Sequence, residues 1–324
     1  MNSYHKYIWS KYFPNDISFK LSRNIDNMPN SEGNYFIFIV EFNNISNNEC
    51  VKVLSNNEDT KILVKHVISR NCSSTKRAPT SGFLLLKDAG EIVLKNVFCC
   101  QNQISAENSA SSLYIKCNKA LLLDSSFSLC KANSVWSPPI YFRSLSTTNS
   151  INCSYNIGKH YPSLSIGLDG EFKNSIVASN KATTERLFGV FQGNTEILQN
   201  MFLDNSGGPV GIIYTENQGN ATVRKCSFVK NTAKAIFFTN RLEKYSSITV
   251  ENCSFVDNTI TSIYSNWGPS AIFSENIGTL SFYVFLPKIM NIESLPKFFN
   301  DDCTCGNSNL YHISINYICI ITLL

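Results

Sequence analysis

The chain of 324 residues is 43% hydrophobic and 16% charged, and 28 basic against 24 acidic residues give it a net charge of +4 at pH 7. This apolar content excludes an intrinsically disordered chain. No run of Lys and Arg is long or clustered enough to indicate a nucleic-acid interface, so we expect no nucleic-acid partner.

Residues 1–60 are predicted to form an N-terminal cap with irregular first coils. Residues 1–10 mix charged, aromatic and polar side chains and lack the apolar core of a secretory signal peptide. The run Tyr35–Val40 is largely apolar and indicates a buried strand. A stack of β coils needs such a cap, because an open terminal coil exposes strand edges and apolar interior.

Residues 61–275 are predicted to be a series of repeats of roughly 22 to 30 residues. The clearest copies, residues 222–231 and 248–258, each combine a β-prone run, an apolar anchor, and Asn three residues after the anchor. Helical repeats are longer than this spacing, and the regular Leu and Asn framework of leucine-rich repeats is missing. Within a copy, Ile248 and Val250 alternate with polar residues, which indicates a strand with one inward face.

The predicted fold is therefore all-β, a single-stranded right-handed parallel β-helix with irregular terminal caps. Stacked Asn side chains at a turn can form amide hydrogen bonds from coil to coil, and Asn also tolerates left-handed backbone. A ladder of aromatic anchors is expected to fill the interior. The earlier anchors are predicted at Phe202, Val177, Tyr155, Phe127, Phe98 and Ile68, with Asn205, Asn180 and Asn71 following three of them.

Residues 276–324 are predicted to form a C-terminal cap that includes a short hydrophobic tail, Leu310–Leu324. As a helix the tail would span about 22 Å, which is short of the roughly 30 Å hydrocarbon core of a bilayer. Two interpretations stay open: the tail associates with a membrane, or it packs over the last coil or belongs to a fragmentary gene product.

Three FxxN tetrapeptides end at Asn205, Asn231 and Asn258, and Gly207–Val210 follows the first where a GGA-plus-aliphatic element is expected. This pattern resembles the repeats of polymorphic membrane proteins of chlamydiae and of their relatives in trichomonad protozoa, which have a pectin lyase-like fold. The resemblance covers about residues 60–275. It implies an exposed β-helix that is linked to adhesion at the cell surface.

The twelve cysteines do not by themselves indicate a redox compartment. Cys153, Cys226 and Cys253 each lie two residues before an anchor and are predicted to form one ladder. In adjacent coils Cys226 and Cys253 would be within disulfide reach, or they would pack as small apolar thiols. Cys303 and Cys305 have no second Cys or His pair nearby, so we predict no zinc site, no other metal and no cofactor.

Polysaccharide-acting β-helix enzymes place paired acids on the outer face of neighbouring coils. Here the acids are isolated in the sequence: Asp124, Asp204 and Asp257, with Asp301 and Asp302 after the last recognisable coil. His66 and His160 are predicted to be surface or turn residues and not catalytic bases. We therefore name no catalytic, cofactor-binding or metal-binding residue.

Two aromatic segments are candidates for recognition: Trp136 and Tyr141 within a predicted excursion at Asn133–Thr148, and Trp267 near a Gly-Pro turn. Their rings either bind a partner or fold back over the coil edges.

The predicted function is a non-enzymatic, surface or adhesion-type β-helix protein, membrane-associated or extracellular, that binds a protein or glycan partner through its extended face. Two alternatives stay open: a polysaccharide lyase or hydrolase, and a structural fragment without its own activity. An aligned cluster of acids and bases on one outer face would favour an enzyme. An uninterrupted polar or aromatic face would favour binding.

Overall fold

The computed structural model describes residues 3–16, 18–22, 33–46, 50–54, 57–75, 81, 83–105, 110–132, 138–184, 186–240, 246–267 and 272–276. The chain divides into two compact units, Met1–Tyr283 and Val284–Leu324, and all described residues lie in the first. The predicted features at Trp136, Asp301, Asp302, Cys303, Cys305 and Leu310–Leu324 lie outside the described residues. The boundaries predicted at residues 60 and 275 stay predictions.

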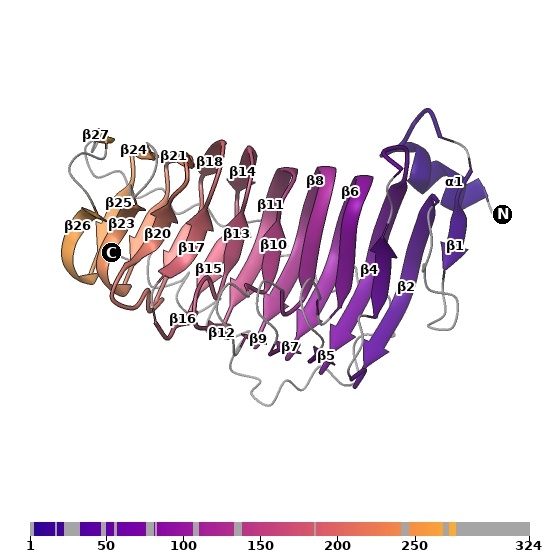
Figure 1. Cartoon of the computed structure of the whole chain (residues 1–324), viewed down its shortest axis with the longest axis horizontal. Helices are drawn as coiled ribbons and strands as arrows, with labels where there is room; N and C mark the ends of the chain where they lie inside the picture. The colour runs from indigo at the N-terminus through magenta and orange to yellow at the C-terminus, as the bar shows by residue number, and fades with distance from the viewer. Residues whose placement is uncertain are drawn as a thin grey trace, which may run out of the picture. The chain divides into compact units, whose positions relative to one another are not determined.

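The first unit is a right-handed parallel β-helix, which confirms the predicted fold class (Figure 1). A single helix in the described part, α1 (Ser3–Ser10), precedes the strands. It is far too short to cross a membrane, and no other described segment is a helix that could do so. The strands are β1 (Lys20–Ser22), β2 (Tyr35–Asn43), β3 (Val51–Leu54), β4 (Lys61–Arg70), β5 (Ser73–Ser74), β6 (Leu84–Cys100), β7 (Gln103–Ile104), β8 (Leu113–Ser128), β9 (Lys131–Ala132), β10 (Ile140–Phe142), β11 (Leu145–Ser154), β12 (Ile157–Gly158), β13 (Leu164–Ile166), β14 (Gly170–Lys173), β15 (Ile176–Ala178), β16 (Lys181–Ala182), β17 (Arg186–Val190), β18 (Asn194–Leu198), β19 (Met201–Leu203), β20 (Gly211–Thr215), β21 (Asn220–Arg224), β22 (Ser227–Val229), β23 (Thr232–Asn240), β24 (Ser247–Glu251), β25 (Ser254–Val256), β26 (Thr259–Trp267) and β27 (Ile272–Asn276).

Each coil has three long faces. Face A contains β10, β13, β17 and β20, face B contains β14, β18, β21 and β24, and face C contains β15, β19, β22 and β25. The longer strands β4 and β11 bend at a corner and contribute to both B and C, while β6 and β8 contribute to all three. Every strand pairs in parallel with its equivalent in the next coil, and Figure 1 shows these strands side by side in chain order.

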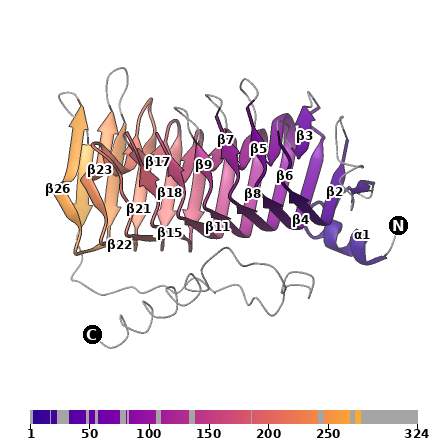
Figure 2. The same ribbon diagram turned by 90° about the horizontal axis from the view of Figure 1, so that it is seen from below.

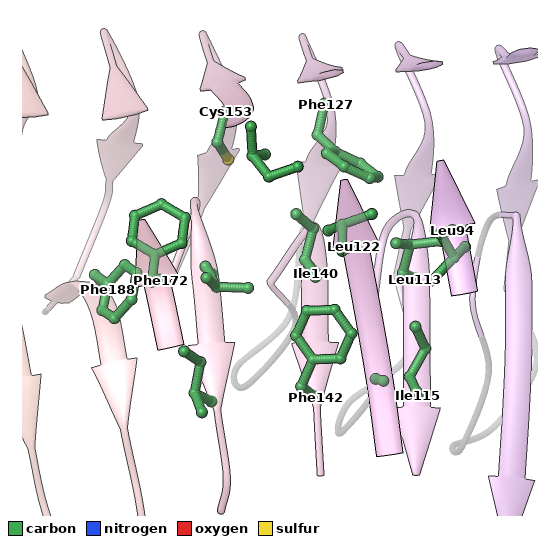
Figure 3. Close-up of a cluster of buried hydrophobic side chains, with 14 of the residues drawn as sticks. Leu94, Leu113, Ile115, Leu122, Phe127, Ile140, Phe142, Cys153, Phe172 and Phe188 are labelled. Atoms are coloured by element: carbon green, nitrogen blue, oxygen red, sulfur yellow. The ribbon is translucent and has the colours of Figure 1, made fainter. Parts of the chain in front are cut away.

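Side chains from the three faces meet inside the coils and form one continuous core. In Figure 3, Ile140 and Phe142 from face A point toward the same interior as Leu122 from face B and Phe127 from face C. The predicted alternation is confirmed at β24, where Ile248 and Val250 are buried in this core. The period-two pattern of each strand therefore determines which residues remain on the outer surface.

The predicted aromatic ladder runs along face C. Phe202 and Phe228 stack with ring centroids 4.9 Å apart, and Phe228 and Phe255 stack at 5.3 Å. Register extends the row toward the N-terminus through Val177, Cys153, Phe127, Cys99, Ser69 and Phe42. The anchors predicted at Tyr155, Phe98 and Ile68 are therefore wrong by one or two residues, because small side chains hold the inward position in those coils.

A buried asparagine ladder follows face C three residues after the anchor in most coils, and Cys130 and Cys72 hold this position in two others. Asn205 donates from Nδ2 to the Val177 carbonyl at 2.8 Å and to Asn231 Oδ1 at 3.0 Å. Its own Oδ1 accepts from the backbone N and the Nδ2 of Asn180, at 3.0 and 3.1 Å. The same pattern joins Asn156 to Asn180 and Asn231 to Asn258. The predicted ladder is confirmed for these residues, but Asn71 is not a member, since Cys72 occupies its position.

Each coil has two corners at which a non-glycine residue adopts left-handed backbone. These residues have φ between 46° and 59°, and at one of the two corners they immediately precede the ladder position. The expectation that the ladder Asn itself takes this conformation is therefore wrong. Before the asparagine ladder they are Asn71, Gln101, Leu129, Tyr155, Ser179, Asp204, Lys230 and Asp257, and at the corner from face B to face C they are His66, Asn96, Asp124, Ser150, Asn174, Gln199, Lys225 and Asn252.

The described cysteines are free thiols, and all but Cys100 are buried. Cys226 and Cys253 are equivalent residues of adjacent coils, because the Ser254 amide donates to the Cys226 carbonyl. Cys153 does not join them as predicted: it is register partner to Phe127 and Val177 in the anchor row. Burial raises the pKa of the Cys130 thiol to about 11, so this thiol is neutral at pH 7 and packs as a small apolar group.

Helix α1 covers an apolar stretch on the outer side of face B. Phe36, Leu63 and Val93 are outward register partners, and Ile8 and Trp9 of α1 pack against them. Figure 2 shows α1 beside these N-terminal coils. Strand β1 pairs with the free edge of β2. The predicted buried strand at Tyr35–Val40 is thus part of the first coil.

The predicted excursion at Asn133–Thr148 is largely incorrect. From Ile140 onward the segment forms β10 and the start of β11, both in register with the neighbouring coils. Tyr141 lies on the outer side of face A and stacks on Tyr114 with ring centroids 5.1 Å apart. Its ring therefore packs on the coil surface.

We expect Asn205→Ala to lower the free energy of unfolding by about 3 kcal/mol, because it leaves several buried partners without hydrogen bonds. Urea denaturation followed by circular dichroism measures this change. The matched control is Asn194→Ala, which removes an exposed cross-coil amide bond to Asn220 and should cost about 0.5 kcal/mol or less. Equal losses in the two variants would show that the buried ladder has no special role.

Candidate functional site

A groove of about 500 Å³ lies on the outer side of face B, across β11, β14, β18 and β21. It begins beyond the apolar stretch that α1 covers. Outward register partners form its floor: Thr147, Glu171, Glu196 and Thr222. Its remaining lining includes Lys119, Leu145, Asp169, Asn194 and Arg224. We call it the face B groove.

Acids and bases in the face B groove form ion pairs along and across the coils. Glu171 Oε2 lies 2.7 Å from Lys173 Nζ on the same strand. Arg224 bridges coils: its Nη1 lies 3.2 Å from Glu196 Oε1 and its Nε lies 2.8 Å from Glu251 Oε2. The hydrogen bond to Glu251 is the main cause that raises the pKa of Arg224 above its ordinary value. These pairs position two neighbouring carboxylates toward solvent.

One edge of the groove is a turn that holds Asp169. Asp169 Oδ1 accepts a hydrogen bond from the Asn194 backbone N. Gly193 has φ +72°, and a Cβ there would lie 2.3 Å from Asp169 Oδ1. Glycine is therefore required for this close approach.

The sequence did not predict this cluster. Glu171, Glu196 and Arg224 are separated by about one repeat each and belong to no local motif. The signal was nevertheless present: aligning Thr222–Asn231 with Ile248–Asn258 places Arg224 beside Glu251, as the register does. A residue-by-residue alignment of all coils would have brought the acids together.

The residues considered in the sequence lie elsewhere. Asp124 pairs with Lys95 at 3.3 Å, and Asp204 Oδ2 accepts from Ser179 Oγ at 3.4 Å, so neither belongs to an acidic pair. His66 lies at a left-handed corner, as predicted for a turn residue. His160 is 7% exposed and is not a surface residue. Among the described residues no cluster of three His, Cys, Asp or Glu side chains could hold a metal ion.

A second polar cluster is buried on the outer side of face A. Arg186 Nη1 lies 3.3 Å from Glu216 Oε2, and their side chains are only 5% and 8% exposed. The Tyr214 hydroxyl donates to Glu216 at 2.6 Å, and the Arg186 guanidinium lies 3.8 Å from the Tyr214 ring centroid. Burial raises the pKa of Tyr214 well above its ordinary value, so the phenol stays a donor. This cluster is closed to solvent, and its charges are paired with each other.

Comparison with known proteins identifies no family for this chain. No protein-family model matches the chain, and no curated protein matches it. Two solved structures of the catalytic domain of a GH87 alpha-1,3-glucanase in complex with nigerose, one of them a variant, are similar at 10% sequence identity. Their TM-scores are 0.24 and 0.22, and the matches cover 76% and 75% of this chain. The chain spans only 63% and 64% of those domains.

We expect Glu216→Gln to lower the free energy of unfolding by about 3–5 kcal/mol, because it removes the carboxylate charge that lies 3.3 Å from the buried Arg186 guanidinium. Chemical denaturation is the measurement. Glu41→Gln is the control: Glu41 is 45% exposed and lies 3.8 Å from Arg70, so its loss should cost about 1 kcal/mol or less. A similarly small loss in Glu216→Gln would contradict a stabilising role for the face A cluster.

Proposed function

We propose that the face B groove binds a neutral glycan without cleaving it. The observation that carries this proposal is the lining: carboxylates, hydroxyls, an amide and cations, with one exposed apolar side chain, Leu145 at 52%. Sugars present hydroxyl groups that donate and accept hydrogen bonds, and an apolar ring face. Glu171, Glu196 and Asp169 would accept from the hydroxyls and would repel an acidic polymer.

The dimensions of the groove also support a linear ligand. Its lining extends over five successive coils, from Lys119 on β8 to Arg224 on β21. Coils stack about 4.8 Å apart, so the row is about 19 Å long, which is the length of a few sugar rings.

The ion pairs favour binding over hydrolysis. A glycosidase needs one carboxyl group that keeps its proton, which active sites achieve with apolar surroundings. Glu171 and Glu196 instead each face a cation at 2.7 and 3.2 Å. Their side chains are also 46% and 36% exposed.

A hydrolase is the second candidate, because Glu171 and Glu196 are register partners on adjacent coils. Neighbouring outer-face acids are the arrangement that cleavage of a glycosidic bond requires. The two candidates differ in their products: binding leaves the polymer intact, whereas hydrolysis releases reducing ends.

A glycan array followed by calorimetry on the best neutral oligosaccharide tests the first candidate. We expect Glu171→Gln/Glu196→Gln to weaken binding about tenfold or more, through loss of charged acceptors. Asp204→Asn is the matched control, since this exposed acid lies outside the groove and Asn suits its left-handed backbone. Unchanged affinity in the double variant would exclude the groove, and reducing ends released by the unmodified protein alone would establish hydrolysis.

We further propose that the protein is exposed at a cell surface and acts in adhesion, as its resemblance to polymorphic membrane proteins implies. The FxxN copies in register at Asn205, Asn231 and Asn258 support this proposal, as does the open groove.

An epitope inserted at the exposed turn residue Gln218, between β20 and β21, tests the location. We expect protease added to intact source cells to remove the epitope, because the turn faces away from the core. A tag in place of Lys6, an exposed residue of α1, provides a second accessible position. Protection of both tags until the cells are lysed would contradict surface exposure.

A further inference from the structure

Two lysines face outward in register on face B, in two of the N-terminal coils whose apolar residues α1 covers. Lys65 on β4 and Lys95 on β6 are direct partners in the parallel ladder. Phe38 precedes them in the row and Leu123 follows. Paired residues of neighbouring strands lie about 5 Å apart, and like charges directly opposite each other are destabilising.

The surroundings of Lys65 increase this cost. Its side chain is half-buried, and burial is the main cause that lowers its pKa, followed by the charges of Lys95 and Lys11. Lys95 has a carboxylate partner, Asp124 at 3.3 Å. Within the described part of the chain, Lys65 forms no ion pair. The fold therefore holds the Lys65 and Lys95 ammonium groups in register with a single acid beside them, while Lys11 lies over the Tyr7 ring, with its Nζ 4.5 Å from the ring centroid.

His66 adds a neutral donor next to Lys65. Burial and the charges of Lys65 and Lys95 lower its pKa to about 4, so the ring is neutral at pH 7. Asn96 Nδ2 lies 3.2 Å from His66 Nδ1, and an amide nitrogen can only donate. Nδ1 is therefore the acceptor, and the ring proton lies on Nε2.

We propose that Lys65 and Lys95 form a binding site for an oxyanion of the sulfate or phosphate type. An oxyanion would neutralise the uncompensated charge of Lys65 and accept from both ammonium groups at once, and such charge-assisted hydrogen bonds are strong. The proposal concerns a different surface from the groove and does not depend on its ligand.

Thermal unfolding of the full chain in sulfate against chloride at equal ionic strength tests the site. We expect sulfate to raise the melting temperature of the unmodified protein saturably, by a few degrees. Lys65→Met keeps the apolar stem and removes the charge, so it should melt no lower in chloride and lose the saturable sulfate response. Lys181→Met, an exposed lysine on β16, should respond to sulfate like the unmodified protein.

Equal sulfate responses in all three proteins would exclude a site for the free ion, because sulfate also stabilises proteins generally by exclusion from their surfaces. A lower melting temperature of Lys65→Met in chloride would overturn the proposal, since the charge would then stabilise the unliganded fold. Should Lys65→Met not fold, His66 ring resonances of the unmodified protein report instead. A saturable shift with added phosphate supports the site, and unmoved His66 resonances exclude it.

The same variants identify the source of the oxyanion. Dextran sulfate, with dextran as its neutral control, presents sulfate esters on a polymer, and inorganic sulfate presents the free ion. Binding of dextran sulfate that Lys65→Met weakens about tenfold or more, without a saturable response to inorganic sulfate, supports a polymer-borne group. A saturable response to inorganic sulfate supports a free ion. Failure of both probes to distinguish Lys65→Met from Lys181→Met overturns the proposal.

Discussion

The buried asparagine ladder is the interaction on which the rest of the structure depends. Each coil turns sharply after face C through a non-glycine residue in left-handed backbone, which costs roughly 1–2 kcal/mol. The next residue offsets this cost: Asn205, for example, forms four hydrogen bonds that join three successive coils. Because an amide both donates and accepts, a one-residue slip would leave buried polar groups unpaired. The ladder therefore fixes the register of the coils that carry an asparagine at this position.

Because the register is fixed, residues that are far apart in the sequence lie next to each other on the surface. Residues 24 to 30 positions apart become direct partners. Inward positions are restricted by packing, so they repeat as Phe, Val and small side chains. Outward positions have no such restriction, and each coil can carry a different side chain there. A site on this scaffold is consequently assembled from single residues of many coils.

The sequence was sufficient to predict the inward residues, which core packing restricts, but not the outward residues, which packing does not restrict. The alternation at Ile248 and Val250, the stacked rings of Phe202 and Phe228, and the ladder at Asn205 all follow from packing and hydrogen bonding that repeat in every coil. The predictions became wrong where a coil uses a small inward residue, as at Cys153 and Ser69. There the nearest large residue was mistaken for the anchor. The largest residue of a strand is therefore not always the inward one.

The face B groove could not be predicted in the same way, because its residues do not repeat. Glu171 and Glu196 are partners only through the register, and their roles depend on cations that belong to a third and a fourth position, Lys173 and Arg224. A search for local motifs finds isolated acids. Only an alignment of every coil, which requires correct anchors, places them side by side.

The outward residues of face B differ between the N-terminal coils and the face B groove. Near the N-terminus the outward residues are apolar, and α1 covers them at Phe36 and Leu63. In the groove the outward charges are open to solvent but compensate one another, so ligand binding must compete with existing ion pairs. In the same N-terminal coils, Lys65 and Lys95 lie two residues after Leu63 and Val93, and their charges are only partly compensated. Folding gains nothing from two like charges in register, so the reason for their placement must be sought outside the chain.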